Sequence, residues 1–84
     1  MDISRAEQRI LHLLAQGGRI EKYRDETNDL QVECYNRDGW LFPQLDLILF
    51  RKLKRKRAIA SRNSGPYRIT KRGLKLVRSQ FDNQ

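Results

Sequence analysis

The residues of this sequence best suited to chemistry are arginines and lysines crowded into one stretch. Six of the seven positions from Arg51 to Arg57 are basic, and residues 51–81 contain twelve bases and no acid, a net charge of +12. Residues 1–50 hold six bases and nine acids, a net charge of −3. This segregation indicates a polyanion or an acidic protein surface as the partner. A charged face kept for solubility is the alternative, although evenly mixed charges would serve that purpose better.

Groups that could catalyse a reaction are few. Cys34 would need an adjacent base to act as a nucleophile, and the single histidine, His12, falls on the polar face of its predicted helix. One histidine and one cysteine do not make a zinc cage. We therefore expect a protein that is not an enzyme and has no catalytic residues, metal or cofactor. Cys34 is interpreted as a small buried residue.

The chain that carries these groups fits a single domain, residues 1–84. It is 38% hydrophobic and 33% charged, with a net charge of +8, which is typical of a small globular domain. The longest apolar run, Leu47–Phe50, is far too short to span a membrane. The sequence lacks the pattern of a signal peptide at its start and has one cysteine, which favours the reducing cytoplasm.

The first half of the sequence predicts a helix and a hairpin. Ser4 and Glu7 have the spacing of a capping box, and Gly17-Gly18 supplies a stop near Gln16. Alternating residues then predict strands over 19–24 and 30–36, joined by polar turn residues 25–29.

A second helix is expected to begin at Pro43 or Gln44 and to continue into the basic segment 51–57. Leu45, Leu49 and Leu53 would form its core line, with Arg51, Lys54 and Arg55 pointing away from it. The apolar stretch 45–50 is then either core or a dimer seam.

The remaining residues predict a short hairpin and a last helix. Strands are expected over 58–61 and 66–69, separated by the turn 62–65, and Pro66 favours an edge position for the second of them. Thr70 has the type and place of a helix cap. Leu74, Val77 and Phe81 would make the inward stripe of that helix. The predicted class is α+β, in the order helix–hairpin–helix–hairpin–helix.

The segment Tyr67-Arg68-Ile69-Thr70, followed by Gly73-Leu74, resembles the chain that leaves the wing of many winged-helix regulators. The resemblance implies a small winged-helix-like domain, whose second helix enters a DNA groove while the hairpin touches the backbone. Such cations would supply affinity with little reading of bases. The candidate residues for binding nucleic acid or a partner are Arg51, Lys52, Lys54, Arg55, Lys56, Arg57, Arg62, Asn63, Arg68, Lys71 and Arg72.

The whole chain also resembles the YjhX family of small bacterial proteins. The segments that carry the resemblance are Ser4-Arg5, Glu7-Gln8-Arg9, Leu11-His12, Gly17-Gly18-Arg19-Ile20, Arg24-Asp25, Val32-Glu33-Cys34-Tyr35, Phe50-Arg51-Lys52-Leu53-Lys54, Gly65-Pro66-Tyr67-Arg68-Ile69, Gly73-Leu74, Val77-Arg78 and Asp82-Asn83. The sequence departs from the family at Trp40-Leu41-Phe42-Pro43 and at Ala58.

The family resemblance implies the toxin of a toxin–antitoxin pair, an inhibitor of DNA topoisomerase I whose antitoxin is an acetyltransferase-like protein. It assigns no inhibitory residue. The alternative function is a winged-helix DNA-binding transcriptional regulator of low sequence selectivity. RNA binding is the weaker option, because the strands offer no ladder of stacking aromatics.

Overall fold

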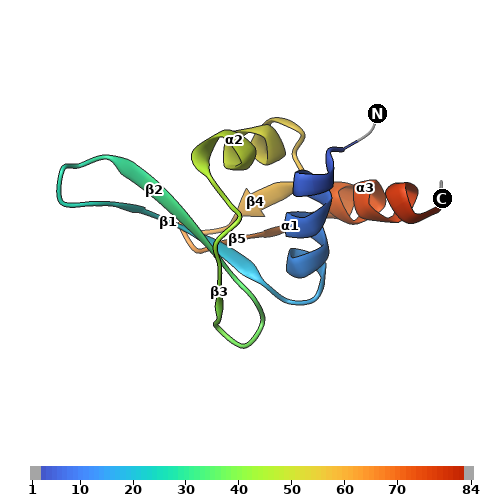
Figure 1. Cartoon of the computed structure of the whole chain (residues 1–84), viewed down its shortest axis with the longest axis horizontal. Coiled ribbons are helices and arrows are strands. Elements are labelled where there is room, and N and C mark those ends of the chain that lie inside the picture. The colour runs from blue at the N-terminus through green and yellow to red at the C-terminus, as the bar shows by residue number, and fades with distance from the viewer. Residues whose placement is uncertain (1–2, 83–84) are drawn as a thin grey trace.

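The computed structural model describes residues 3–82, with the side chains of residues 3–78. This part of the chain forms three helices and one five-stranded antiparallel sheet, so the predicted α+β class is confirmed (Figure 1). The elements in chain order are α1 (Arg5–Ala15), β1 (Arg19–Arg24), β2 (Leu30–Tyr35), β3 (Leu41–Phe42), α2 (Leu47–Arg55), β4 (Ile59–Ser61), β5 (Tyr67–Ile69) and α3 (Lys71–Asp82).

The sheet has the strand order β3-β2-β1-β5-β4. β1 and β2 are paired along their whole length, from Arg19↔Tyr35 to Arg24↔Leu30. The later hairpin, β4–β5, joins them through the pair Ile20↔Tyr67. Two segments that are distant in sequence therefore share one sheet, with β1 at its centre.

The predicted order of elements lacked one strand. Leu41–Phe42, which was expected to lead directly into a helix, forms β3 and pairs with β2 through Cys34↔Phe42. The turn before it is closed by Asn36, whose side-chain oxygen accepts hydrogen bonds from the backbone N–H groups of Asp38 and Trp40. The first predicted hairpin is thus a three-stranded meander.

The capping box of α1 is confirmed. The Glu7 N–H donates to Ser4 Oγ at 3.1 Å, and the Ser4 N–H donates to Glu7 Oε1 at 2.9 Å. The helix ends at the predicted place, with Gln16 as its C-cap and Gly17 in the left-handed region at φ +107°.

Helix α2 begins later than predicted. Its first residue is Leu47, because Asp46 caps it by accepting a hydrogen bond from the Leu49 N–H at 2.8 Å. Pro43 and Gln44 lie in the preceding turn. The helix also ends before Arg57, which adopts φ +59°.

The predicted edge position of the strand after Pro66 was wrong. β5 lies between β1 and β4, and β4 is the strand at that edge. Pro66 precedes the first β5 residue, Tyr67, so its missing N–H removes no hydrogen bond from the described strand. Thr70 caps α3 as predicted, since its Oγ1 accepts a hydrogen bond from the Gly73 N–H at 3.0 Å.

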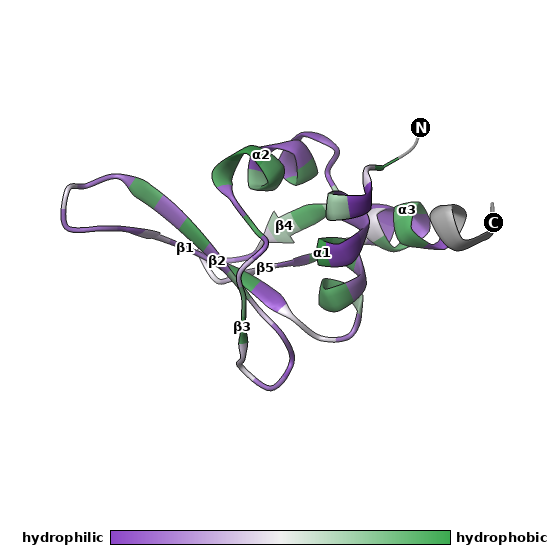
Figure 2. Cartoon of the chain, viewed as in Figure 1, coloured by the Kyte–Doolittle hydropathy of each residue, from purple (hydrophilic) through white to green (hydrophobic). Residues whose placement is uncertain are grey.

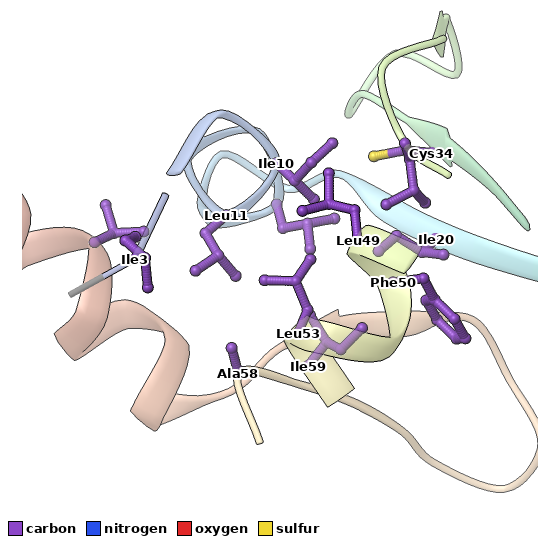
Figure 3. Packing of buried hydrophobic residues seen from close by; sticks show 13 residues of the cluster. Ile3, Ile10, Leu11, Ile20, Cys34, Leu49, Phe50, Leu53, Ala58 and Ile59 are labelled. Carbon is purple, nitrogen blue, oxygen red and sulfur yellow. The ribbon is translucent and has the colours of Figure 1, made fainter. Parts of the chain in front are cut away.

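The core lies between the helices and one face of the sheet. Side chains from α1, α2 and the strands converge there, and the buried ones include Ile10, Ile20, Phe50 and Leu53 (Figure 3). The apolar stretch 45–50, which was expected to be either core or a dimer seam, contains both buried and exposed residues. Leu45, Leu49 and Phe50 are buried, whereas Ile48 is 66% exposed.

The inward stripe predicted for α3 is confirmed in part. Val77 is buried and Leu74 is half-buried, while Leu76 packs against the core as well. The side chain of Phe81 lies outside the described residues.

Figure 2 shows that α2 changes from hydrophobic residues at its start to hydrophilic residues toward its end.

The β1–β2 hairpin projects from this body as an arm, and the described chain measures 44 × 25 × 24 Å (Figure 1). All four β1 residues from Glu21 to Arg24 are exposed. The tip is held by Asp25, whose Oδ1 accepts hydrogen bonds from Thr27 Oγ1 and the Asp29 N–H, and whose Oδ2 accepts one from Gln31 Nε2. Hydrogen bonds from Thr27, Gln31 and the Asp29 backbone lower the pKa of Asp25 to about 2.

Candidate nucleic-acid interface

Four of the candidate cations lie along the exposed face of α2. The helix buries Leu49, Phe50 and Leu53 against the core, which leaves the polar face outward. The three residues predicted to be most exposed, Arg51, Lys54 and Arg55, are exposed, and so is Lys52. None of the four forms a salt bridge with a described residue. This face can therefore accept phosphate oxygens or carboxylates without breaking an internal ion pair.

Lys56 has a different surrounding from its neighbours. Its ammonium group lies 2.9 Å from Oε1 and 2.8 Å from Oε2 of Glu7, a residue that is only 2% exposed. Burial acts to raise the pKa of Glu7, but hydrogen bonds from Lys56 and Ser4 outweigh it and hold that pKa below its ordinary value. Lys56 thus neutralises a buried carboxylate that links α1 to the end of α2.

Arg57 stands at the junction between α2 and the β4–β5 hairpin. Its carbonyl oxygen accepts a hydrogen bond of 2.7 Å from Thr70 Oγ1, so the backbone at Arg57 is tied to the start of α3. Its side chain is exposed. The backbone of Arg57 therefore helps to hold the fold, while its side chain is available to contact a binding partner.

Three further candidates gather around the β4–β5 hairpin. Arg62, Arg68 and Lys71 line a hollow of about 610 Å³, with Ala60, Ser61, Pro66, Ile69 and Thr70 as its other walls. Arg68 is also a structural residue, because its guanidinium donates to the carbonyl oxygens of Gly17 and Gly18, both at 3.2 Å.

Asn63 and Arg72 are exposed but do not line this hollow. Asn63 lies in the turn of the hairpin at φ +56°. Arg72 lies in the first turn of α3.

The candidate residues do not form one continuous face. Tyr67 contacts Phe50 of α2, with ring centroids 5.0 Å apart, so α2 covers the Tyr67 face of the hairpin. Arg68 follows Tyr67 in the strand and is paired with Ala60, and successive side chains point to opposite faces of a sheet. The α2 cations and the hollow at Arg68 are thus separated by the hairpin.

The structure also shows the surroundings of the two groups considered for catalysis, Cys34 and His12. Cys34 is fully buried, and burial raises the pKa of its thiol to about 11, which disfavours the reactive thiolate. His12 is exposed, and its ring lies 3.3 Å from Gln16 Nε2 on the same helix. The interpretation of Cys34 as a buried structural residue is confirmed.

One cation that belongs with this surface was missed. Lys22 lies in the half of the chain with net negative charge, yet its ammonium group is 5.7 Å from the centre of the Tyr67 ring. Because successive side chains of a strand point to opposite faces, Lys22 lies on the same face of β1 as Ile20. The sequence did not reveal that Ile20 pairs with Tyr67 of the basic half.

Comparison with known proteins places these features in a family. The YjhX toxin family, described as "Putative toxin of bacterial toxin-antitoxin pair", matches residues 1–84. The chain belongs to this family. The UPF0386 protein of Hyphomonas neptunium is 69% identical over 84 residues, covering 99% of both chains. The UPF0386 protein of Agrobacterium fabrum is 67% identical over 85 residues, covering both chains completely.

Membership of the YjhX toxin family confirms the resemblance read from the sequence, and a toxin of such a pair implies an antitoxin as its partner. No solved structure matches the chain. Among the described residues, no helix is long and apolar enough to cross a membrane.

Proposed function

We propose that this toxin acts without catalysis, as an inhibitor of DNA topoisomerase I that binds the enzyme or its complex with DNA. The observation that carries the proposal is the row of exposed cations on α2, which have no acidic partner among the described residues of a chain from a toxin family. Exposed cations without an acidic partner can enter the channel of the enzyme that normally holds DNA, or they can bind the phosphates of the DNA strand itself.

The properties of the potentially reactive groups support binding over catalysis. The thiol of Cys34 is buried with a raised pKa, so it is a poor nucleophile. We propose a protein that needs no cofactor or metal and works in the cytoplasm. Its antitoxin is proposed to be an acetyltransferase-like protein.

The order of elements around α2 supports a winged-helix-like mode of contact. A helix followed by a two-stranded hairpin, with a third strand beside that hairpin, is what such domains use to hold DNA. Here α2 precedes β4–β5, and β1 pairs with β5. One feature differs from a helix-turn-helix. In that motif a helix directly precedes the recognition helix, whereas here the meander β1–β3 lies between α1 and α2.

This arrangement favours a second candidate function, a DNA-binding transcriptional regulator. The exposed residues of α2 are mainly arginine and lysine, which supply affinity for phosphates more than recognition of bases. The regulator would therefore have low sequence selectivity.

The test of the proposal is plasmid relaxation by the topoisomerase I of the host. Excess wild-type protein is expected to slow relaxation, and the Arg51→Glu, Arg55→Glu double variant is expected to lose this effect because two exposed cations become anions. The matched control is Lys75→Glu, Arg78→Glu, which makes the same charge change at exposed positions of α3. Circular dichroism of both variants reports whether they are folded.

An unchanged relaxation rate with excess wild-type protein would contradict the proposed inhibition. Gel shifts across a salt series then distinguish the regulator, because binding to phosphates must weaken along a straight line of log affinity against log salt. Absence of a shift at low salt would remove the regulator as well.

A further inference from the structure

A second, smaller hollow lies where the arm leaves the β4–β5 hairpin. It has a volume of about 290 Å³ and is lined by Glu21, Lys22, Ser61, Ser64, Gly65, Pro66 and Tyr67. It lies where β1 continues for four residues beyond Ile20, the position that pairs with Tyr67, and residues that precede Tyr67 form its other side. The hollow therefore has one wall from each half of the sequence.

Two ammonium groups lie near the Tyr67 ring: Lys22 lines the hollow, whereas Lys54 reaches the ring from α2 and is not part of the hollow's wall. Lys22 Nζ, from β1, and Lys54 Nζ, from α2, each lie 5.7 Å from the centre of the Tyr67 ring. The electron-rich face of an aromatic ring attracts cations and so holds both side chains toward it. Two positive charges around one ring attract an anion to this part of the surface.

No carboxylate of the described residues forms an ion pair with either lysine, Lys22 or Lys54. Glu21 lines the hollow, but its carboxylate is bound to Arg19 at 2.9 Å, and residues 19 and 21 share the face of β1 opposite to Lys22. The Ser64 hydroxyl, which makes no hydrogen bond to the described part of the chain, adds a donor to the hollow.

We propose that this hollow binds a phosphate group of a nucleic-acid backbone, with Lys22 in its wall and Lys54 reaching toward it from α2 past the Tyr67 ring. The choice of a nucleic-acid phosphate as the ligand depends on the proposed contact of the toxin with DNA. Phosphate fits the site because it is anionic and accepts several hydrogen bonds, which two ammonium groups and a hydroxyl can donate. Through Lys54 the site is continuous with the exposed cations of α2, so the arm takes part in holding the strand.

The test is the salt dependence of DNA binding by the full chain, measured by fluorescence anisotropy with a labelled duplex and without topoisomerase. Each phosphate contact that is lost lowers the slope of log affinity against log salt by about 1. The Lys22→Gln, Lys54→Gln variant is therefore expected to lower the slope by about 2. The matched control, Lys75→Gln, Arg78→Gln, removes the same charge from α3 and is expected to leave the slope unchanged. The Lys22→Arg, Lys54→Arg variant should restore it.

A wild-type slope in Lys22→Gln, Lys54→Gln would overturn the site, and so would an equal fall in the control variant. A wild-type chain that does not bind DNA at low salt would overturn it too. Failure of the proposed topoisomerase inhibition is a separate result, because it appears in the relaxation assay and leaves the anisotropy slopes unaffected. Thermal unfolding of the variants shows whether a lost slope reflects lost structure.

Discussion

The two hairpins of the sheet are built from the same kind of element but are held in different ways. β4–β5 has strands of three residues and is fixed to the body at several points. Arg68 donates hydrogen bonds to the carbonyl groups of Gly17 and Gly18, just after α1, and Thr70 donates one to the carbonyl of Arg57. β1–β2 has strands of six residues, and beyond Ile20 it is ordered mainly by its own pairing and by the hydrogen bonds of Asp25.

Because of this difference, substitutions in the two hairpins should affect the stability of the protein differently. A change at the base of β4–β5 alters packing shared by α3, β4 and α1, so it should act on the whole fold. A change at the tip of β1–β2 alters groups that lie outside the hydrophobic core, so it should act locally. Three substitutions test this contrast, in order of decreasing effect.

The largest effect is expected from Gly73→Ala, in the first turn of α3, where Gly73 packs against the base of β4–β5. A Cβ added at Gly73 would overlap the Ala58 carbonyl oxygen and come within 2.7 Å of Ile69 Cγ1. Overpacking of this kind should lower the free energy of unfolding by about 3 kcal/mol, measured by urea denaturation. Gly39→Ala is the comparison, because its Cβ meets nothing within 4 Å and only its φ of +90° is unfavourable. Equal losses in the two variants would show that the base of β4–β5 is not tightly packed.

A smaller effect is expected from Glu7→Gln, which leaves Lys56 beside a neutral partner where α2 leads into β4. Loss of a charged hydrogen bond to a largely buried group should reduce stability by roughly 2 kcal/mol at neutral pH. Because the folded-state pKa of Glu7 is lowered, its contribution is present above the ordinary value of 4.5 and is lost as the pH falls through the folded-state pKa.

Urea denaturation at neutral pH and near pH 4 should therefore show a smaller difference in Glu7→Gln than in the wild type. Lys56→Met is the matched control, since it removes the other member of the pair. A full wild-type pH dependence in Glu7→Gln would contradict the assignment.

The smallest global effect is expected from Asp25→Ala at the tip of the arm. The variant should keep the wild-type unfolding midpoint while the amide of Asp29, which donates to Asp25, exchanges its hydrogen faster. In the wild type the same loosening should appear as the pH falls from 3.8 toward the folded-state pKa of about 2. Hydrogen exchange followed by NMR measures both. A large drop in the unfolding midpoint would show that the arm supports the body.

Local signals in the sequence were sufficient for most elements of this fold. The capping box at Ser4 and the cap at Thr70 involve residues three positions apart, so spacing predicted the first, and residue type and place predicted the second. Asp46 has the same kind of local role, yet the start of α2 was placed at Pro43 or Gln44 because proline favours the first turn of a helix. The error arose because Asp46, which follows Pro43 by three residues, was not considered as the cap of this helix.

Features that depend on distant residues were not predicted. The sequence marked Lys56 as a cation for binding, but its partner Glu7 is 49 residues away and is revealed only when α1 meets α2. Pro66 suggested an edge strand because proline lacks an N–H group. The pairing of Ile20 with Tyr67, which gives β5 a second neighbour, cannot be recognised from the residues around Pro66. For the same reason Lys22 was not assigned to the candidate interface.

The pairing of β1 with β5 also bears on the synthesis of the protein. A ribosome releases the N-terminal residues first, so β1 and β2 emerge long before Tyr67, Arg68 and Lys56, which complete their surroundings. Contacts this distant in sequence form late and slow down folding. We therefore expect the nascent toxin to acquire its folded shape only when translation is nearly finished, which would delay any activity that requires the assembled cationic surface until then.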